Sequence, residues 1–206
     1  MKKINLEASI RARLKTIAKD SERNFDSVLL QYFQERFLYR LSISPYKENF
    51  ILKGALLFVA YEIPRSRPTK DIDFLGKNIS NTSENLISAM KEILEVQVQD
   101  GLRFDSESLI SETIKQDAEY KGIRIYCNAY LGSAYSRLHF DIGFGDIVIP
   151  KPVILDFPVL LSDIPAPELI AYTPESAIAE KFEAIVNLGM ITSRMKDFYD
   201  IYYLSG

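Results

Sequence analysis

The sequence predicts an α/β (α+β) fold in which helices flank a mixed β-sheet. Three observations carry this prediction. Apolar residues recur at helical spacing near the start, alternate with polar residues in the middle, and return to helical spacing after the proline-rich segment 165–167. We therefore expect a main domain over residues 1–165, which begins with helices, and a helical C-terminal section over residues 166–206.

Composition places the chain among ordinary globular proteins. It has 206 residues, of which 47% are hydrophobic and 26% charged, enough for a sizeable core. The net charge of -3 argues against a general nucleic-acid-coating protein, although one basic patch would suffice for an RNA substrate. The single cysteine, Cys127, excludes an intrachain disulfide and fits a reducing compartment. We expect a cytoplasmic protein without a membrane partner, since we find neither a signal peptide nor a membrane-spanning apolar run.

The first segment predicts two helices. Leu6, Ile10, Leu14 and Ile17 recur at helical spacing, and a second apolar stripe begins near Asp26. The first helix also carries basic residues, which form either a solvated face or a surface that helps to hold RNA. They are Arg11, Arg13, Lys15 and Lys19.

The middle and end of the chain predict a sheet followed by helices. Residues 50–58 indicate a buried strand, a glycine turn and a helix, and residues 64–68 a polar loop. Thr173 is placed to cap a helix that begins at Pro174 and ends at Gly189, and Ser193 begins another. The remaining expected elements are a strand at 71–75, a helix at 83–98, strands from residue 122 and at 138–144, and an edge strand at 153–161, which contains Pro158.

Acidic residues on two of these strands suggest a metal site. Asp71 and Asp73 are two positions apart, so strand alternation points both carboxylates to one face. Such a pair is either solvated or, because adjacent like charges are costly, built to hold a divalent cation such as Mg²⁺. Asp141 alternates with apolar neighbours and is either a third ligand or a plain polar-face residue. Three carboxylates could hold two Mg²⁺ ions.

A glycine turn supplies a possible phosphate site. Lys53, Gly54 and Ala55 lie between the buried strand and the following helix, where backbone N–H groups can bind an anion. Lys53 either contacts phosphate or extends its amine from the strand end to solvent. Thr69 shares a face with Asp71 and could touch a nucleotide.

Several stretches resemble one protein family. They are Leu-Lys-Gly-Ala-Leu-Leu-Phe at 52–58, Arg-Pro-Thr-Lys-Asp-Ile-Asp at 67–73, Ala-Glu-Lys-Phe at 179–182 and Arg-Met-Lys-Asp-Phe-Tyr-Asp at 194–200. Their order is similar to that of the AbiEii/AbiGii toxin family, within the nucleotidyltransferase superfamily of the DNA polymerase β type. The resemblance covers nearly the whole chain.

The resemblance implies a nucleotidyltransferase domain over 1–165, with Asp71 and Asp73 as metal ligands. Lys53 and Gly54 would meet the triphosphate, and Lys181 and Asp197 would correspond to further active-site residues. From the residues alone, Lys181 could equally be a surface lysine, and Asp197 could form a salt bridge with the nearby Arg194.

The activity expected from this resemblance is transfer of a nucleoside monophosphate from an NTP to an acceptor hydroxyl. RNA, with tRNA as a candidate, would be the acceptor, and an AbiEi-like antitoxin the partner. Alternatives are transfer to a protein or small molecule, and a non-catalytic nucleotide-binding module. Two features differ from the family pattern: Gly54 is followed by Ala55 where serine or glycine is usual, and relatives usually continue beyond the point where this chain ends, Gly206.

Overall fold

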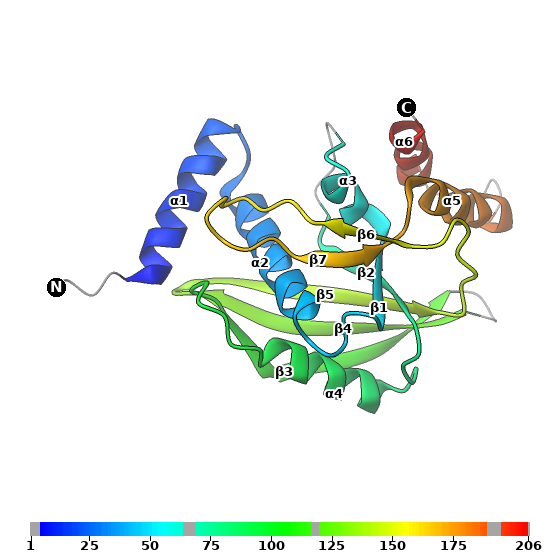
Figure 1. Ribbon diagram of the computed structural model, residues 1–206, viewed down its shortest axis with the longest axis horizontal. Helices are drawn as coiled ribbons and strands as arrows, with labels where there is room; N and C mark the ends of the chain where they lie inside the picture. The colour runs from blue at the N-terminus through cyan, green and yellow to red at the C-terminus, as the bar shows by residue number, and fades with distance from the viewer. Residues whose placement is uncertain (1–4, 64–68, 117–119, 189–194, 206) are drawn as a thin grey trace.

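The N-terminal part of the protein is helical, as the sequence predicts. The computed structural model describes residues 5–63, 69–116, 120–188 and 195–205. Helix α1 spans Leu6–Asp20 and helix α2 spans Phe25–Ser42 (Figure 1). Each begins behind an asparagine: the side chain of Asn5 accepts a hydrogen bond from Ala8 N–H, and that of Asn24 from Asp26 N–H. These caps satisfy backbone donors that the first turn leaves open.

The described strands form one seven-stranded mixed sheet in the order β3-β4-β5-β2-β1-β7-β6. Strands β2 and β5 are parallel, as are β1 and β7, whereas the other neighbours are antiparallel. The strands are β1 (Phe50–Lys53), β2 (Asp71–Gly76), β3 (Arg103–Gln116), β4 (Tyr120–Leu131), β5 (Ala134–Phe144), β6 (Val153–Asp156) and β7 (Glu168–Ala171). The α/β class expected from the sequence is confirmed.

The remaining described helices complete the fold. They are the single 3₁₀ turn Gly54–Leu56, α3 (Leu57–Ala60), α4 (Ser83–Leu94), α5 (Pro174–Leu188) and α6 (Met195–Leu204). Helices α5 and α6 lie at the opposite end of the molecule from α1 (Figure 1). Thr173 caps α5, since its Oγ1 accepts a hydrogen bond of 3.2 Å from Ser176 N–H. In the described ranges, no helix combines the length and apolar character that crossing a membrane requires.

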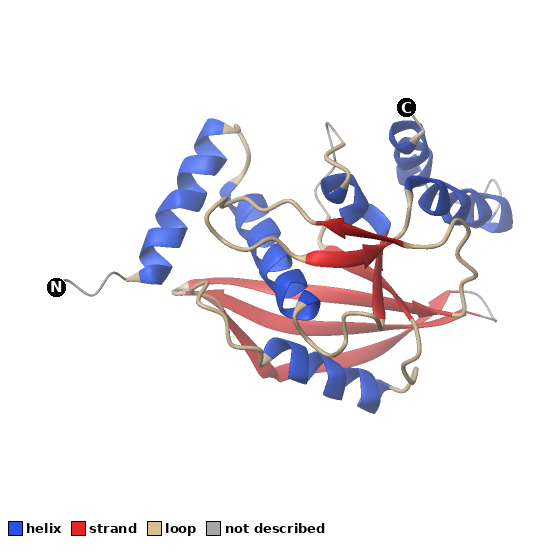
Figure 2. Cartoon of the chain, in the orientation of Figure 1, coloured by secondary structure: helices blue, strands red, loops and turns tan. Residues whose placement is uncertain are grey.

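The core lies between the sheet and helices α2 and α4. Phe37 of α2 packs its ring 4.3 Å from that of Phe140 and 6.3 Å from that of Phe74, on strands β5 and β2. Helix α4 packs along β3, so both helices cover the same face of the long strands (Figure 2). The opposite face of β2 and β5 therefore carries the polar side chains.

A buried ion-pair cluster fixes α2 to the loop before β3. Asp100 receives hydrogen bonds from both terminal nitrogens of Arg40, at 2.6 and 3.1 Å, and lies 3.4 Å from Arg36 Nε. The Tyr32 hydroxyl donates a hydrogen bond of 2.9 Å to the Asp100 backbone carbonyl. Buried charges of this kind are tolerated because each has an opposite partner.

Several sequence predictions differ from the structure in extent. The helix expected over 83–98 ends at Leu94, and the strand expected over 153–161 ends at Asp156, before Pro158, although it does lie at a sheet edge. Strands β3 and β7 were not predicted. The loop 64–68, the helix end at Gly189 and the helix start at Ser193 lie outside the described residues.

Candidate functional site

Two parallel strands bring the predicted carboxylates to one place. The register of β2 against β5 places Asp73 opposite Asp141 and Asp71 opposite His139. The alternating neighbours Ile72 and Phe140 are fully buried on the helix-covered face. The three aspartates therefore share the other face of adjacent strands, as the sequence predicts for a metal site. We call Asp71, Asp73 and Asp141 the carboxylate cluster.

The glycine turn lies directly against this cluster. Strand β1 pairs antiparallel with β2, so Lys53 is opposite Asp73 and Gly54 follows immediately. Gly54 has a φ of +71°, and a Cβ built on it would lie only 2.0 Å from Asp73 Oδ2. Both the backbone conformation and the close approach require glycine here.

The central carboxylate is electrostatically unfavourable in its own surroundings. Burial, together with the negative charges of Asp141 and Asp71, raises the pKa of Asp73 to about 7, although Lys53 acts in the opposite direction. A buried acid beside two others is relieved either by taking up a proton or by binding a cation. Asp73 therefore favours a cation at this position.

The outer carboxylates have protein partners in this conformation. Arg124 of β4 forms two hydrogen bonds to Asp141, Nε to Oδ1 and Nη2 to Oδ2, both 2.6 Å long. His139 Nδ1 lies 3.1 Å from Asp71 Oδ1. In keeping with these contacts, no group of three His, Cys, Asp or Glu side chains within the described residues is arranged to hold a metal ion.

The donor set nevertheless fits Mg²⁺. This ion takes oxygen ligands and commonly uses one or two carboxylates together with substrate phosphates. Asp71 and Asp73 project from the same face of β2, and the positive charge that Arg124 now provides at Asp141 could be provided by a metal ion instead. Asp141 would join such a site once its contacts with Arg124 rearrange.

Lys53 lies among acidic groups rather than in solvent. Its Nζ donates to Asp146 Oδ2 at 2.8 Å and to Glu180 Oε1 at 3.0 Å, and Tyr172 donates to the same Asp146 oxygen at 3.1 Å. Burial acts to lower the pKa of Lys53, but the charges of Glu180 and Asp146 outweigh this effect, so the pKa is raised. The amine is therefore cationic, and it lies at the end of β1 beside the glycine turn.

Lys181 and Asp197 are brought together by α5 and α6. Lys181 Nζ lies 3.4 Å from Asp197 Oδ1 and 2.7 Å from Oδ2 of the fully buried Asp200. Glu180, the neighbour of Lys181, contacts Lys53 and so connects α5 to the end of β1. Arg194, the alternative partner expected for Asp197, lies outside the described residues.

The other expected nucleotide contacts lie near the cluster. Thr69 lies just before β2, separated from it by Lys70, and its hydroxyl donates a hydrogen bond to the Asp71 backbone carbonyl at 3.3 Å. Ala55 is buried in the 3₁₀ turn that follows Gly54. Its small side chain therefore belongs to the core, and only its backbone N–H could meet a ligand.

Sequence reasoning missed part of this network. Arg124, Asp146, Glu180 and Tyr172 were not among the predicted site residues. Strand alternation around 123–127 could have placed Arg124 on the polar face. The contacts of Lys53 with Asp146 and Glu180 could not be found in this way, because they join positions 93 and 127 residues apart.

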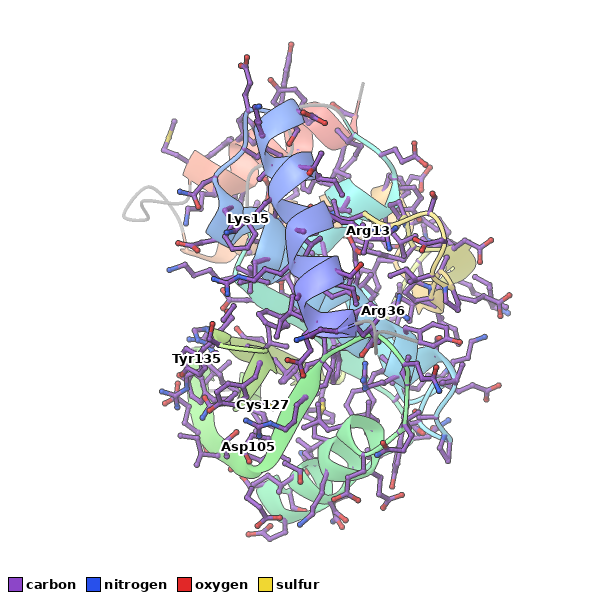
Figure 3. All side chains as sticks on the ribbon, turned by 90° about the vertical axis from the view of Figure 1, so that its left-hand side faces the viewer. Arg13, Lys15, Arg36, Asp105, Cys127 and Tyr135 are labelled. Atoms are coloured by element: carbon purple, nitrogen blue, oxygen red, sulfur yellow. The ribbon has the colours of Figure 1, made fainter. Side chains whose placement is uncertain are left out.

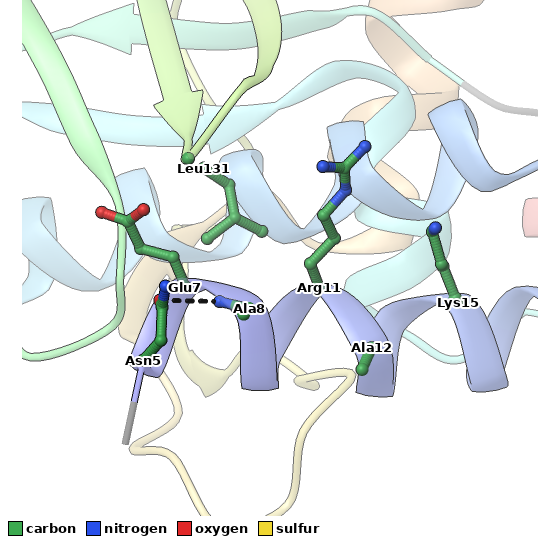
Figure 4. A pocket seen from close by; sticks show the side chains of 8 residues that line it. Asn5, Glu7, Ala8, Arg11, Ala12, Lys15 and Leu131 are labelled. Carbon is green, nitrogen blue, oxygen red and sulfur yellow. Dashed lines mark hydrogen bonds between the residues drawn. The ribbon is translucent and has the colours of Figure 1, made fainter. Parts of the chain in front are cut away.

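A separate hollow lies between α1 and the β4–β5 turn (Figure 4). Its volume is about 390 Å³. Its lining includes Arg11 and Lys15, but none of the carboxylates of the cluster. Of the expected basic face, Arg11 donates to Ser133 Oγ at 3.1 Å and Arg13 pairs with Asp163. This hollow is therefore distinct from the candidate site.

Comparisons with known proteins find a similar fold among solved structures. The crystal structure of JHP933 from Helicobacter pylori has a TM-score of 0.55 to this chain at 14% identity, covering 88% of this chain and 67% of that one. A candidate nucleotidyltransferase from H. pylori has a TM-score of 0.49 at 15% identity, covering 87% and 67%. The search of curated proteins finds no match.

The family model described as "Nucleotidyl transferase AbiEii toxin, Type IV TA system" matches residues 36–206. That match spans most of the chain and includes the glycine turn and the carboxylate cluster. Membership of this family implies a nucleotide substrate and a cognate antitoxin. The chain belongs to the AbiEii family of nucleotidyltransferase toxins.

Proposed function

We propose that this protein transfers a nucleoside monophosphate from an NTP to a hydroxyl group of RNA, in a Mg²⁺-dependent reaction. The observation that carries the proposal is the position of Asp73. Its half-buried carboxylate lies against the Gly54 turn and opposite Asp141, which would set a cation site beside a phosphate-binding backbone. Nucleotidyl transfer needs both together.

Different residues of the site would bind the metal ion and the triphosphate. Asp71, Asp73 and Asp141 would hold Mg²⁺, which when bound supplies charge neutralisation of the triphosphate. The glycine turn would receive the phosphates, and Lys53 would pair with them after exchanging its contacts with Asp146 and Glu180. Positioning and charge stabilisation of this kind account for most of the catalysis in phosphoryl transfer.

The proposed reaction is a single displacement. The acceptor oxygen forms a bond to the α-phosphorus while the bond from that phosphorus to the bridging oxygen of the β-phosphate breaks. Pyrophosphate leaves with that oxygen, and the hydroxyl proton passes to the carboxylate cluster. An acceptor hydroxyl must therefore reach the polar face of β2 and β5, where the outer edge of Asp71 is accessible: its side chain is 40% exposed.

Labelled nucleotides test this function. Purified protein is incubated with Mg²⁺, each α-³²P NTP in turn and total cellular RNA, beside Asp71→Asn and the matched control Asp156→Asn. Asp156 is an exposed acid on edge strand β6, far in the sheet order from β5. A labelled RNA band that is lost only in Asp71→Asn supports the proposal. Label in protein or in a small product would show that this molecule, and not RNA, is the acceptor. NTP binding without any transfer would indicate a non-catalytic module.

A further inference from the structure

A row of tyrosine and arginine side chains continues from the carboxylate cluster. Strands β4 and β5 pair Arg124 with Asp141, and the next pairs on the same face lead away from the cluster. Strand β3 places Arg103 opposite Tyr130, and Asp105 and Ile110 opposite Asn128 and Tyr126. We call the resulting surface the tyrosine face. It consists of Tyr126, Tyr130, Tyr135, Arg103, Arg137 and Asn128.

Rings and guanidinium groups alternate along this face. The Arg137 guanidinium lies 4.3 Å from the centre of the Tyr126 ring, and that of Arg103 lies 4.2 Å from the Tyr130 ring. The rings of Tyr130 and Tyr135 are 5.4 Å apart. These contacts preorganise flat aromatic and cationic groups on a rigid sheet.

No helix within the described residues covers the tyrosine face. Leu138 and Cys127, which alternate with its residues, are fully buried on the side of α2 and α4. By contrast, Tyr135 is 53% exposed and lies at the margin of the molecule, on the side of the strands away from α4 (Figure 3). Large aromatic side chains on an open face usually indicate a binding surface.

We infer that the tyrosine face binds the single-stranded end of a polynucleotide acceptor and leads its terminal hydroxyl to the carboxylate cluster. The inference rests on the proposed function and adds the place where the acceptor binds. Bases would stack on the three tyrosine rings and on the guanidinium planes, and the arginine N–H donors would meet phosphates. A sheet face with exposed aromatics is a known way to hold two or three bases.

The direction and charge of the face favour this occupant. Tyr135 and Asp141 are six positions apart on β5, or about 20 Å at the usual strand rise, so the row spans several nucleotides. At its far end, Arg11 contacts Ser133 in the β4–β5 turn, and Lys15 lines the hollow beside it together with one acid, Glu7 (Figure 4). Cations therefore lie at the far end of the row, where the strand would enter, and carboxylates at the end where its hydroxyl would react.

The acidic side chains near the tyrosine face do not remove its preference for a polynucleotide. Glu112 on β3 accepts a hydrogen bond from the Tyr126 hydroxyl, so its charge lies against the edge of the face. On this face, the residues of β4 and β5 beyond Asp141 are aromatic, amide, arginine or histidine, whereas β3 adds Asp105 and one exposed aliphatic residue, Ile110. A protein-binding patch would usually have an apolar centre.

Direct binding measurements test the inference without requiring turnover. Fluorescence anisotropy with a labelled single-stranded RNA oligonucleotide is compared for wild type, Tyr130→Ala, Tyr135→Ala and the ring-preserving Tyr130→Phe and Tyr135→Phe. The alanine variants should weaken binding roughly 5-fold or more, and the phenylalanine variants should retain it. Tyr202→Ala, at a tyrosine that is 72% exposed on α6, is the control that should bind as wild type does.

Salt dependence and kinetics separate this inference from the proposed function. Arg137→Gln should reduce the slope of log affinity against log salt concentration by about 0.7, the value for one phosphate contact on a single strand. Tyrosine-dependent binding without transfer would support the face and contradict the function. Oligonucleotide affinity that is unchanged in both alanine variants would overturn the inference, even if the wild-type protein transfers nucleotide to RNA.

Discussion

The carboxylate of Asp73 occupies the space that a side chain on Gly54 would need. The distance from Asp73 Oδ2 to an ideal Cβ on Gly54 is 2.0 Å, shorter than any real contact of a Cβ atom. The backbone at the end of β1 therefore packs directly against a side chain in the middle of β2. This relationship connects the glycine turn to the proposed cation site.

Gly54→Ala should therefore displace Asp73 and abolish Mg²⁺-dependent nucleotide binding. We also expect it to destabilise the protein by about 1–3 kcal/mol, since the φ of +71° is itself strained for alanine. Isothermal titration calorimetry and thermal unfolding measure the two effects. Gly145→Ala is the matched control: its φ is +89°, but nothing lies within 4 Å of the added Cβ. Equal binding losses in both variants would show that strain, not the contact with Asp73, matters.

Asp73→Asn should stabilise the metal-free protein. Burial and the neighbouring carboxylates raise the pKa of Asp73 to about 7, so at pH 8 the folded protein must hold an unfavourable charge that asparagine lacks. We expect the free energy of unfolding to increase by about 1 kcal/mol or more. Each kcal/mol should raise the Tm by roughly 2–4 °C. Mg²⁺ should raise the Tm of wild type and of Asp156→Asn, but not that of Asp73→Asn. A lower Tm for metal-free Asp73→Asn would refute the electrostatic argument.

Arg124→Met should strengthen Mg²⁺ binding while weakening the fold. Hydrogen bonding to Asp141 raises the pKa of Arg124, so the guanidinium stays charged and competes with a metal ion for that carboxylate. Without it, the concentration of Mg²⁺ that gives half of the Tm increase should fall. Arg23→Met, which removes a surface arginine bonded to Gln31, should leave this concentration unchanged. Weaker Mg²⁺ binding in Arg124→Met would instead assign Arg124 a supporting role at the site.

Glu35 should make stability fall as pH rises from about 5 to 7. Burial raises the pKa of Glu35 to about 7, despite hydrogen bonds from Leu160 N–H and Gln31, from 4.5 in an ordinary setting. Between these values the folded state binds more protons than the unfolded state, so the free energy of unfolding decreases with pH, by about 1.4 kcal/mol per pH unit at most.

Glu35→Gln tests this pH dependence because glutamine has the same shape and stays neutral. The free energy of unfolding, measured with urea at pH 5.5 and 7.5, should differ less between the two pH values in Glu35→Gln than in wild type. Asp73 contributes in the same direction over this range, so the remaining slope should fall further in the double variant with Asp73→Asn. The exposed Glu48→Gln is the control. A wild-type slope in Glu35→Gln would show that Glu35 is ionised in the folded protein.

Local patterns were enough to predict much of the fold and the centre of the site. Alternation placed Asp71 and Asp73 on one face of a strand, and the apolar neighbours of Asp141 indicated a second strand. Their adjacency, however, depends on the parallel pairing of β2 with β5, which joins segments 68 residues apart and has no local signal. From the sequence, Asp141 was therefore either a third ligand or a plain polar-face residue, and only the strand pairing of the structure brings it opposite Asp73.

The unpredicted elements share a physical cause. Strand β3 lies at the outer edge of the sheet and carries mostly polar residues, so its sequence shows little apolar alternation. Strand β7 has only four residues, and it is held by pairing with β1 and β6 rather than by its own propensity. The contacts of Lys53 with Asp146 and Glu180 likewise exist only in the folded chain.

We propose that the carboxylate cluster performs Mg²⁺-dependent nucleotidyl transfer. The most direct measurement is the initial rate of label transfer from α-³²P NTP to RNA, over a range of Mg²⁺ concentrations, for wild type, Asp73→Asn and Asp156→Asn. We expect transfer by wild type and Asp156→Asn to require Mg²⁺, and Asp73→Asn to be slower by about 1000-fold, the equivalent of several kcal/mol of lost metal stabilisation. Transfer by Asp73→Asn at the wild-type rate, or transfer without any divalent cation, would contradict the account.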